Sequence, residues 1–219
     1  LADRKLFEEN GLELPTNYEE FENVMKVFKE KGITPFISDF KYDYTCLEVL
    51  QGVSISQLMT LEGIEWRQKN EREKKGKHAT LDENVWLPVF EKFYSFVETT
   101  GLGQKDINNS FLVVNNEFNA KNAAVARNTA AVCAGLAITN PELDPVMLPF
   151  YGETENDNWI LTYPTYQVAV SKKVEENSRK KEIVLDMLSL MLSEEGELAT
   201  VQGAPLLSYT MTNQLELSP

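Results

Sequence analysis

The sequence predicts an α/β domain in which helices outnumber strands. Segments with apolar residues at helical spacing alternate with short apolar runs that are partly β-branched, an order typical of α/β units. The clearest unit is a capped helix from Thr16 that ends at Gly32 and leads into the apolar run 33–38. The 219 residues allow one large domain or two small lobes. Hydrophobic residues make up 42% of the chain, so a largely disordered or fibrous protein is excluded.

The first helices follow from their end signals and apolar faces. A helical pattern begins at once in residues 1–11. Thr16 is a good N-cap, and Glu19 three residues on would complete a capping box. The run 33–38 should then be a buried strand. After Thr16, apolar residues recur at helical spacing and should pack on the sheet. They are Phe21, Val24, Met25 and Phe28.

The middle of the chain should be mostly helical. Thr45 can cap one helix, and Asp82 or Asn84 can cap another. The last of these helices carries an apolar face rich in aromatic residues, and glycines follow it. The helices are expected over residues 45–51, 56–74 and 81–99.

The second half should add strands and one long helix. No linker there is long enough to separate autonomous domains, and the nearest to a boundary is the Pro- and Gly-punctuated stretch 139–158. A short helical stretch is expected at residues 116–121 and a long amphipathic helix at 178–201. Strands are expected at residues 111–115, 123–127, 145–151 and 166–171.

The charge balance excludes several classes of protein. There are 34 acidic and 21 basic residues, a net charge of −13, which disfavours nucleic acid as a partner. The one basic cluster, residues 67–77, contains acidic residues and is interpreted as a solvated helix end. No apolar run approaches the roughly 18 residues that a membrane-spanning helix requires.

Cysteine and histidine usage gives no metal or catalytic site. Cys46 and Cys133 lie far apart without a CxxC partner, and we interpret both as buried small hydrophobic residues. His78, the single histidine, sits in a loop with nothing that looks preorganised around it. No P-loop or GxGxxG motif is present, so we expect no metal and no cofactor.

Three segments, in order, resemble the extracellular solute-binding proteins of ABC importers, in the carbohydrate-binding, maltose-binding-protein-like group. Residues 6–36 resemble that family's helix–strand passage, with Tyr18 where Trp is usual. Residues 118–130 (FNAKNAAVARNTA) are similar to its "F..G.AAM...G.W" motif, although the final aromatic residue is missing. Residues 146–207 follow its order of strand, VAVSKK, long helix and GAPLLSY.

The resemblance implies a truncated, helix-rich form of the two-lobe type II periplasmic-binding-protein fold. Residues 1–147 would form most of lobe two, and residues 148–219 would be the returning segment of lobe one. The ligand would be a sugar or oligosaccharide bound between the lobes and delivered to a membrane permease. The full-length protein would be lipid-anchored at the cell surface, with the anchor upstream of this sequence.

Candidate ligand contacts combine aromatic rings, which stack on sugars, with planar polar groups, which bind hydroxyls. The loop carrying Tyr42, Asp43 and Tyr44 follows a buried strand, where α/β proteins bind ligands, and the family has an aromatic contact there. The resemblance adds Arg127 and Asn128 in a second contact loop, and Trp159 and Tyr163 near the hinge. Each group also has an alternative interpretation. Tyr42 and Tyr44 could cover the next helix, and Arg127 and Asn128 could form a turn. Trp159 and Tyr163 could pack on a strand.

A glycan-processing enzyme and a non-binding structural domain remain the competing hypotheses. A glycosidase places two carboxylates in a cleft. The paired acids at residues 8–9, 19–20 and 194–195 fall on helix surfaces or ends, where solvated acids are expected. Only Asp43 lies near a strand end beside aromatic residues, so binding without chemistry is favoured.

Overall fold

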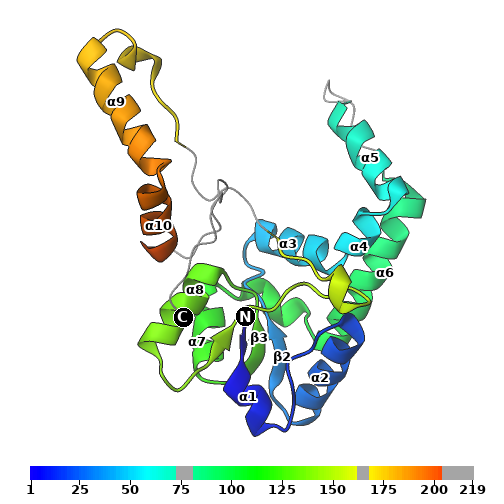
Figure 1. Cartoon of the computed structure of the whole chain (residues 1–219). Coiled ribbons are helices and arrows are strands. Elements are labelled where there is room, and N and C mark those ends of the chain that lie inside the picture. Colours follow the sequence, from blue (N-terminus) through cyan, green and yellow to red (C-terminus); the bar gives the residue numbers. More distant parts are fainter. Residues whose placement is uncertain (73–80, 162–167, 204–219) are drawn as a thin grey trace.

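A small mixed sheet lies at the centre of the protein (Figure 1). The computed structural model describes residues 1–72, 81–161 and 168–203. In the sheet order β2-β3-β1-β4, β2 and β3 are parallel and β1 is antiparallel to both of its neighbours. The four strands are β1 (Ala2–Asp3), β2 (Thr34–Ile37), β3 (Ala123–Ala126) and β4 (Pro145–Val146).

Helices pack on both faces of this sheet, and the described part of the chain is helix-rich, as the sequence predicts. Short 3₁₀ turns occur at Gln104–Asn108, Glu155–Asp157 and Lys172–Val174. The α-helices are α1 (Arg4–Glu9), α2 (Tyr18–Glu30), α3 (Asp43–Val53), α4 (Ile55–Leu58), α5 (Leu61–Arg72), α6 (Glu83–Thr100), α7 (Phe111–Asn119), α8 (Ala130–Thr139), α9 (Ser178–Met191) and α10 (Glu194–Gly203).

The main core lies on one face of the sheet, where α1, α2 and α6 pack. Phe28 of α2 is fully buried, and its ring meets that of Phe7 edge-on at 5.0 Å between centroids. Phe96 of α6 contacts the ring of Phe36 in β2 at 5.1 Å. The predicted apolar face of α2 is confirmed, because Phe21, Val24, Met25 and Phe28 are all buried.

A second, smaller core lies on the opposite face of β2 and β3. Val114 and Phe118 of α7 are buried there with Ile37 of β2 and the outer alanines of β3. Phe36 and its neighbour Ile37 thus point into different cores, as the alternation of side chains along a strand requires. Because both faces are covered, β3 is apolar throughout and β2 is apolar after Thr34.

The predicted strand at residues 111–115 is wrong, because this segment is the first half of α7. Ser110 accepts a hydrogen bond from the Val113 amide at 3.5 Å as N-cap, and Val114 and Phe118 are buried one helical turn apart. The apolar run at 130–138 forms α8, a helix that the sequence analysis did not assign. Its N-cap is Thr129, whose hydroxyl accepts from the Val132 amide at 3.4 Å.

Several other helix and strand boundaries differ from the predicted ones by one or more residues. The N-cap of α2 is Asn17, not Thr16, because the Asn17 side chain accepts from the Glu20 amide at 2.9 Å. The helix expected from Thr45 begins at Asp43. The segments 56–74 and 178–201 each divide into two helices, strand 145–151 shortens to β4, and residues 168–171 form no strand.

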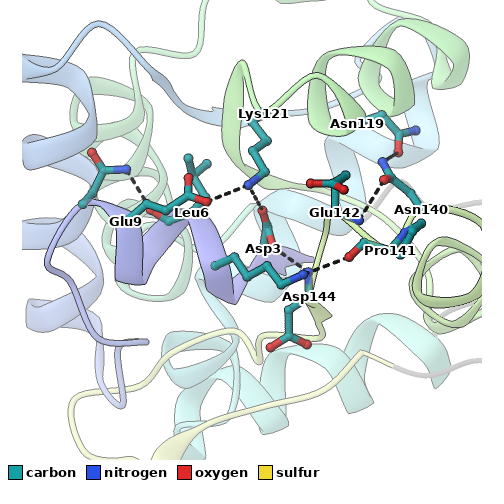
Figure 2. Close-up of polar contacts among 11 residues, drawn as sticks. Asp3, Leu6, Glu9, Asn119, Lys121, Asn140, Pro141, Glu142 and Asp144 are labelled. Carbon is teal, nitrogen blue, oxygen red and sulfur yellow. Dashed lines mark hydrogen bonds and ion pairs between the residues drawn. The ribbon is translucent and has the colours of Figure 1, made fainter.

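Polar contacts join the start of the chain to the turn before β3 and to the entry of β4 (Figure 2). Buried Asp3 accepts a hydrogen bond from the Asp144 amide at 2.7 Å through Oδ1. Its Oδ2 lies 3.7 Å from Nζ of Lys121, which also binds Glu9 at 3.0 Å. Lys121 has a left-handed backbone (φ 57°), which turns α7 into β3. This network fixes the ends of three segments that are distant in the sequence.

The segment after β4 continues along the main core. Tyr151 is buried against Phe21, at 5.5 Å between ring centroids. The backbone amides of Phe150 and Trp159 each donate to the other's carbonyl at 2.8 Å. The Asn158 side chain donates to the Thr16 carbonyl at 2.8 Å. Residues 148–159 therefore pack on the first part of the chain, and the division of the chain at residue 147 stays a prediction.

Helix α9 stands apart from the sheet (Figure 1). No residue of α9 is buried, although it carries many large apolar side chains. The exposed ones in this helix and its C-cap are Ile183, Leu185, Met187, Leu190, Met191 and Leu192. An apolar surface of this kind is typical of a helix that is covered by another protein surface.

Replacing Phe28 by Ala should destabilise the protein by about 3–5 kcal/mol, because the ring is fully buried and its removal leaves a cavity. The matched control is Ile138→Ala on α8, where the side chain is 84% exposed and the change should stay within about 0.5 kcal/mol. Urea denaturation of both variants measures the difference. Equal stabilities would contradict the core assignment.

Candidate functional site

Two loops meet at the carboxyl ends of β2 and β3. The Arg127 amide donates to the Ile37 carbonyl at 2.9 Å, which brings residues 38–42 beside residues 127–129. The first loop leads directly into α3 and the second into α8. Ligands of α/β proteins bind at this end of parallel strands. The two loops therefore form the candidate site, and both were predicted from the sequence as ligand contacts.

Tyr42 and Tyr44 form an exposed aromatic pair in the first loop. Their ring centroids are 5.9 Å apart with an interplanar angle of 29°. The two residues are 38% and 56% exposed, so the rings are available to a ligand. Asp43 between them is exposed as well and is the first residue of α3. The structure thus brings the three predicted residues of this loop together on the surface.

Arg127 connects the second loop to the first. Its guanidinium forms an ion pair with Glu48 of α3 through Nη2 and lies 3.6 Å from Oδ1 of Asp39 through Nη1. The same guanidinium lies over the Tyr44 ring, 5.8 Å from its centroid, which is within the range of a cation–π contact. Arg127 therefore joins the end of β3, the end of β2 and one of the exposed tyrosines.

Asp39 is a buried carboxylate at the end of β2. Its side chain is 2% exposed, and neither oxygen accepts a hydrogen bond within the described part of the chain. Burial raises the pKa of Asp39, and the nearby Arg127 charge partly opposes this rise. The hydroxyl of neighbouring Ser38 is also buried and unpaired among the described residues. The strand end thus holds polar groups whose hydrogen-bonding capacity is unused.

Asn128 has its side chain engaged in the structure. Its Nδ2 donates to Oδ1 of Asn115 in α7 at 2.8 Å, and its Oδ1 accepts from the Thr129 amide at 3.0 Å. These contacts shape the turn between β3 and α8. The position of Asn128 is compatible with both interpretations drawn from the sequence, the ligand contact and the turn.

The third predicted group is not joined to the tyrosine pair. Trp159 is half-buried, and its backbone pairs with Phe150. Within residues 1–72, 81–161 and 168–203, no hydrogen bond, ion pair or ring contact links Trp159 to the two loops. Tyr163 lies outside the described residues. The roles of both residues as ligand contacts stay predictions.

Sequence reasoning missed Asp39 and Glu48. Asp39 directly follows the predicted strand, so its place at a strand end was a usable signal. Glu48 lies four residues after Tyr44, on the same side of α3. Nothing in the sequence pairs Glu48 with Arg127, because that contact depends on how α3 and β3 lie in three dimensions.

The described residues contain neither a metal-binding cluster nor a helix suited to cross a membrane. No group of three or more His, Cys, Asp or Glu side chains in these residues is arranged to hold a metal ion. Among the same residues, no helix combines the length and apolar character needed to span a membrane.

The comparisons with known proteins give a similarity of fold. No family model matches the sequence, and no curated protein matches it. A solved structure described as a chitin oligosaccharide binding protein is similar, with a TM-score of 0.62 and 15% sequence identity. The similarity covers 94% of this chain and 50% of that protein, so this chain spans about half of the neighbour's length. The shared feature is the helix-rich α/β fold.

Removing Arg127 should raise the pKa of Asp39 further, because the guanidinium charge opposes the effect of burial. In wild type, the contribution of Asp39 to the free energy of unfolding should fall as pH rises from the ordinary Asp pKa of 3.8 through the raised value. In Arg127→Gln, this decline should extend to higher pH. NMR titration of the Asp39 carboxyl carbon measures the pKa, with Lys121→Gln as control. An unchanged Asp39 pKa in Arg127→Gln would show that the two groups do not interact.

Proposed function

We propose that this protein binds a carbohydrate at the loops that carry Tyr42, Tyr44 and Arg127. The observation that carries the proposal is the exposed pair of tyrosine rings beside a guanidinium at the ends of two parallel strands. Flat aromatic rings stack on the C–H faces of sugars, and planar polar groups bind the hydroxyls. The printed name of the structural neighbour, a chitin oligosaccharide binding protein, supports the same ligand class.

We propose further that the chain is part of the substrate-binding component of an ABC importer. In this proposal, residues 1–147 form most of lobe two, and residues 148–219 are the returning segment of lobe one. A ligand bridging the lobes would favour a closed state, which a membrane permease would recognise. The protein would be held at the cell surface by a lipid anchor.

Three observations support the two-lobe proposal. The neighbouring structure has a chain about twice as long, which leaves room for a further lobe. Strands β1 and β4 lie side by side and antiparallel, so the chain enters and leaves the sheet at one place. The exposed apolar side chains of α9 would be covered by the rest of lobe one.

Binding is proposed without chemistry. Of the three carboxylates in these loops and the start of α3, Asp39 and Glu48 pair with Arg127, and Asp43 is exposed between the two tyrosines. An acid and a base of a glycosidase would instead be directed at the scissile bond. Turnover of a chromogenic glycoside, abolished by a single carboxylate substitution, would favour the enzyme hypothesis.

Tyr42→Ala and Tyr44→Ala should each weaken oligosaccharide binding by about fivefold, because an aromatic contact contributes on the order of 1 kcal/mol beyond area burial. Calorimetry with a panel of neutral glucose, mannose, galactose and N-acetylglucosamine oligosaccharides, on the full polypeptide, measures the affinities. Tyr94→Ala is the control, since this tyrosine is exposed on α6. A sugar whose affinity is the same in all three variants would exclude this loop from the site.

A further inference from the structure

We propose that Arg127, held between Glu48 and Asp39, makes the site select uncharged sugars and reject acidic ones. This inference rests on the proposed function, because it concerns the ligand of the same site. It assigns Arg127 as a donor to neutral oxygen atoms and not as an anchor for a carboxylate or phosphate.

The guanidinium of Arg127 faces two carboxylates of the protein itself. Nη2 pairs with Glu48, and Nη1 lies 3.6 Å from Asp39, so both ends of the fork face a carboxylate. The Arg127 side chain is 11% exposed, and the Asp39 side chain is 2% exposed. An anion binds arginine best through two parallel hydrogen bonds to the fork. In this site that fork is directed at the protein's own carboxylates.

The residues around Arg127 carry more negative than positive side chains. In residues 38–48 and 127–129, the carboxylates of Asp39, Asp43 and Glu48 stand against the cations of Lys41 and Arg127. The amino ends of α3 and α8 add partial positive charge, about half a unit each and confined to the first turn. The Glu48 carboxylate is paired with Arg127, and the Asp39 carboxylate lies 3.6 Å from it. An acidic ligand reaching Arg127 would therefore meet Glu48 and Asp39 as like charges.

Arg127 retains hydrogen-bond donors that the two carboxylates do not use. A guanidinium has five N–H donors. Glu48 accepts a hydrogen bond from Nη2, whereas Asp39 at 3.6 Å accepts none. Donors therefore remain for a hydroxyl or an amide carbonyl oxygen, which brings no net charge. Because Glu48 and Asp39 also hold the side chain in place, little conformational freedom is lost when such a ligand binds.

The test compares matched ligands on the full polypeptide. The first ligand is the tightest neutral binder of the oligosaccharide panel, and the second is the same oligosaccharide oxidised at C6 to its uronate. In wild type, the uronate should bind at least about tenfold more weakly. Added salt should reduce this difference in affinity, because salt screens the repulsion between the uronate and the carboxylates of Glu48 and Asp39.

Glu48→Gln removes one of the two negative charges that repel the uronate. It should reduce the ratio of neutral to uronate affinity at least about threefold, because the uronate binds more tightly. The control is Glu65→Gln, an exposed glutamate on α5, which should leave the ratio of the two affinities unchanged. The ratio is used because Glu48→Gln can also loosen Arg127 and weaken both ligands together.

The outcomes separate this inference from the proposed function. If the neutral sugar binds and the uronate binds equally well or better in wild type, the inference is overturned while sugar binding stands. An unchanged ratio in Glu48→Gln also overturns it. If no oligosaccharide of the panel binds, the proposed function fails and the inference fails with it.

Discussion

The parallel pairing of β2 and β3 is the constraint on which the rest of the structure depends. Ile37 pairs with Ala126, and hydrogen bonds from Thr34 to Asn122 and from Arg127 to Ile37 continue the pairing beyond each end. A shift of one residue would exchange the two faces of a strand. It would therefore disturb both cores and move Arg127 away from the end of β2. The register that builds the cores also assembles the candidate site.

How much of this fold the sequence could predict depended on the length and periodicity of each segment. The face of α2 and the strands at residues 34–37 and 123–126 were predictable, because their patterns are long or bounded by glycine and polar turns. The runs that became α7 and α8 are short and apolar, and periodicity alone does not separate helix from strand in such runs. Their caps, Ser110 and Thr129, were the available signals. The two loops of the site were predictable as strand ends and by resemblance, but the partners of Arg127 were not.

Two buried aspartates, Asp3 of β1 and Asp39 after β2, have different surroundings. Asp3 accepts a hydrogen bond from the Asp144 amide and is near Lys121 (Figure 2). Asp39 has Arg127 at 3.6 Å but no hydrogen bond among the described residues. A buried carboxylate without hydrogen bonds is costly. Asp3 uses one carboxylate oxygen in a structural junction and leaves Oδ2 without a hydrogen bond, whereas both Asp39 oxygens are unused next to exposed rings.

The energetics of the Arg127 cluster indicate positioning more than stability. Moving charged groups into the interior costs several kcal/mol per ion, and the attraction between the partners often only offsets that cost. An apolar cluster of similar volume would hold the strand ends together equally well. It would not direct a guanidinium toward Tyr44 from the end of β3 or fix α3 to that strand through Glu48. What the cluster adds is a fixed orientation of the Arg127 guanidinium between the two loops. Because of this orientation, the affinity of the site should depend on the charge of the ligand.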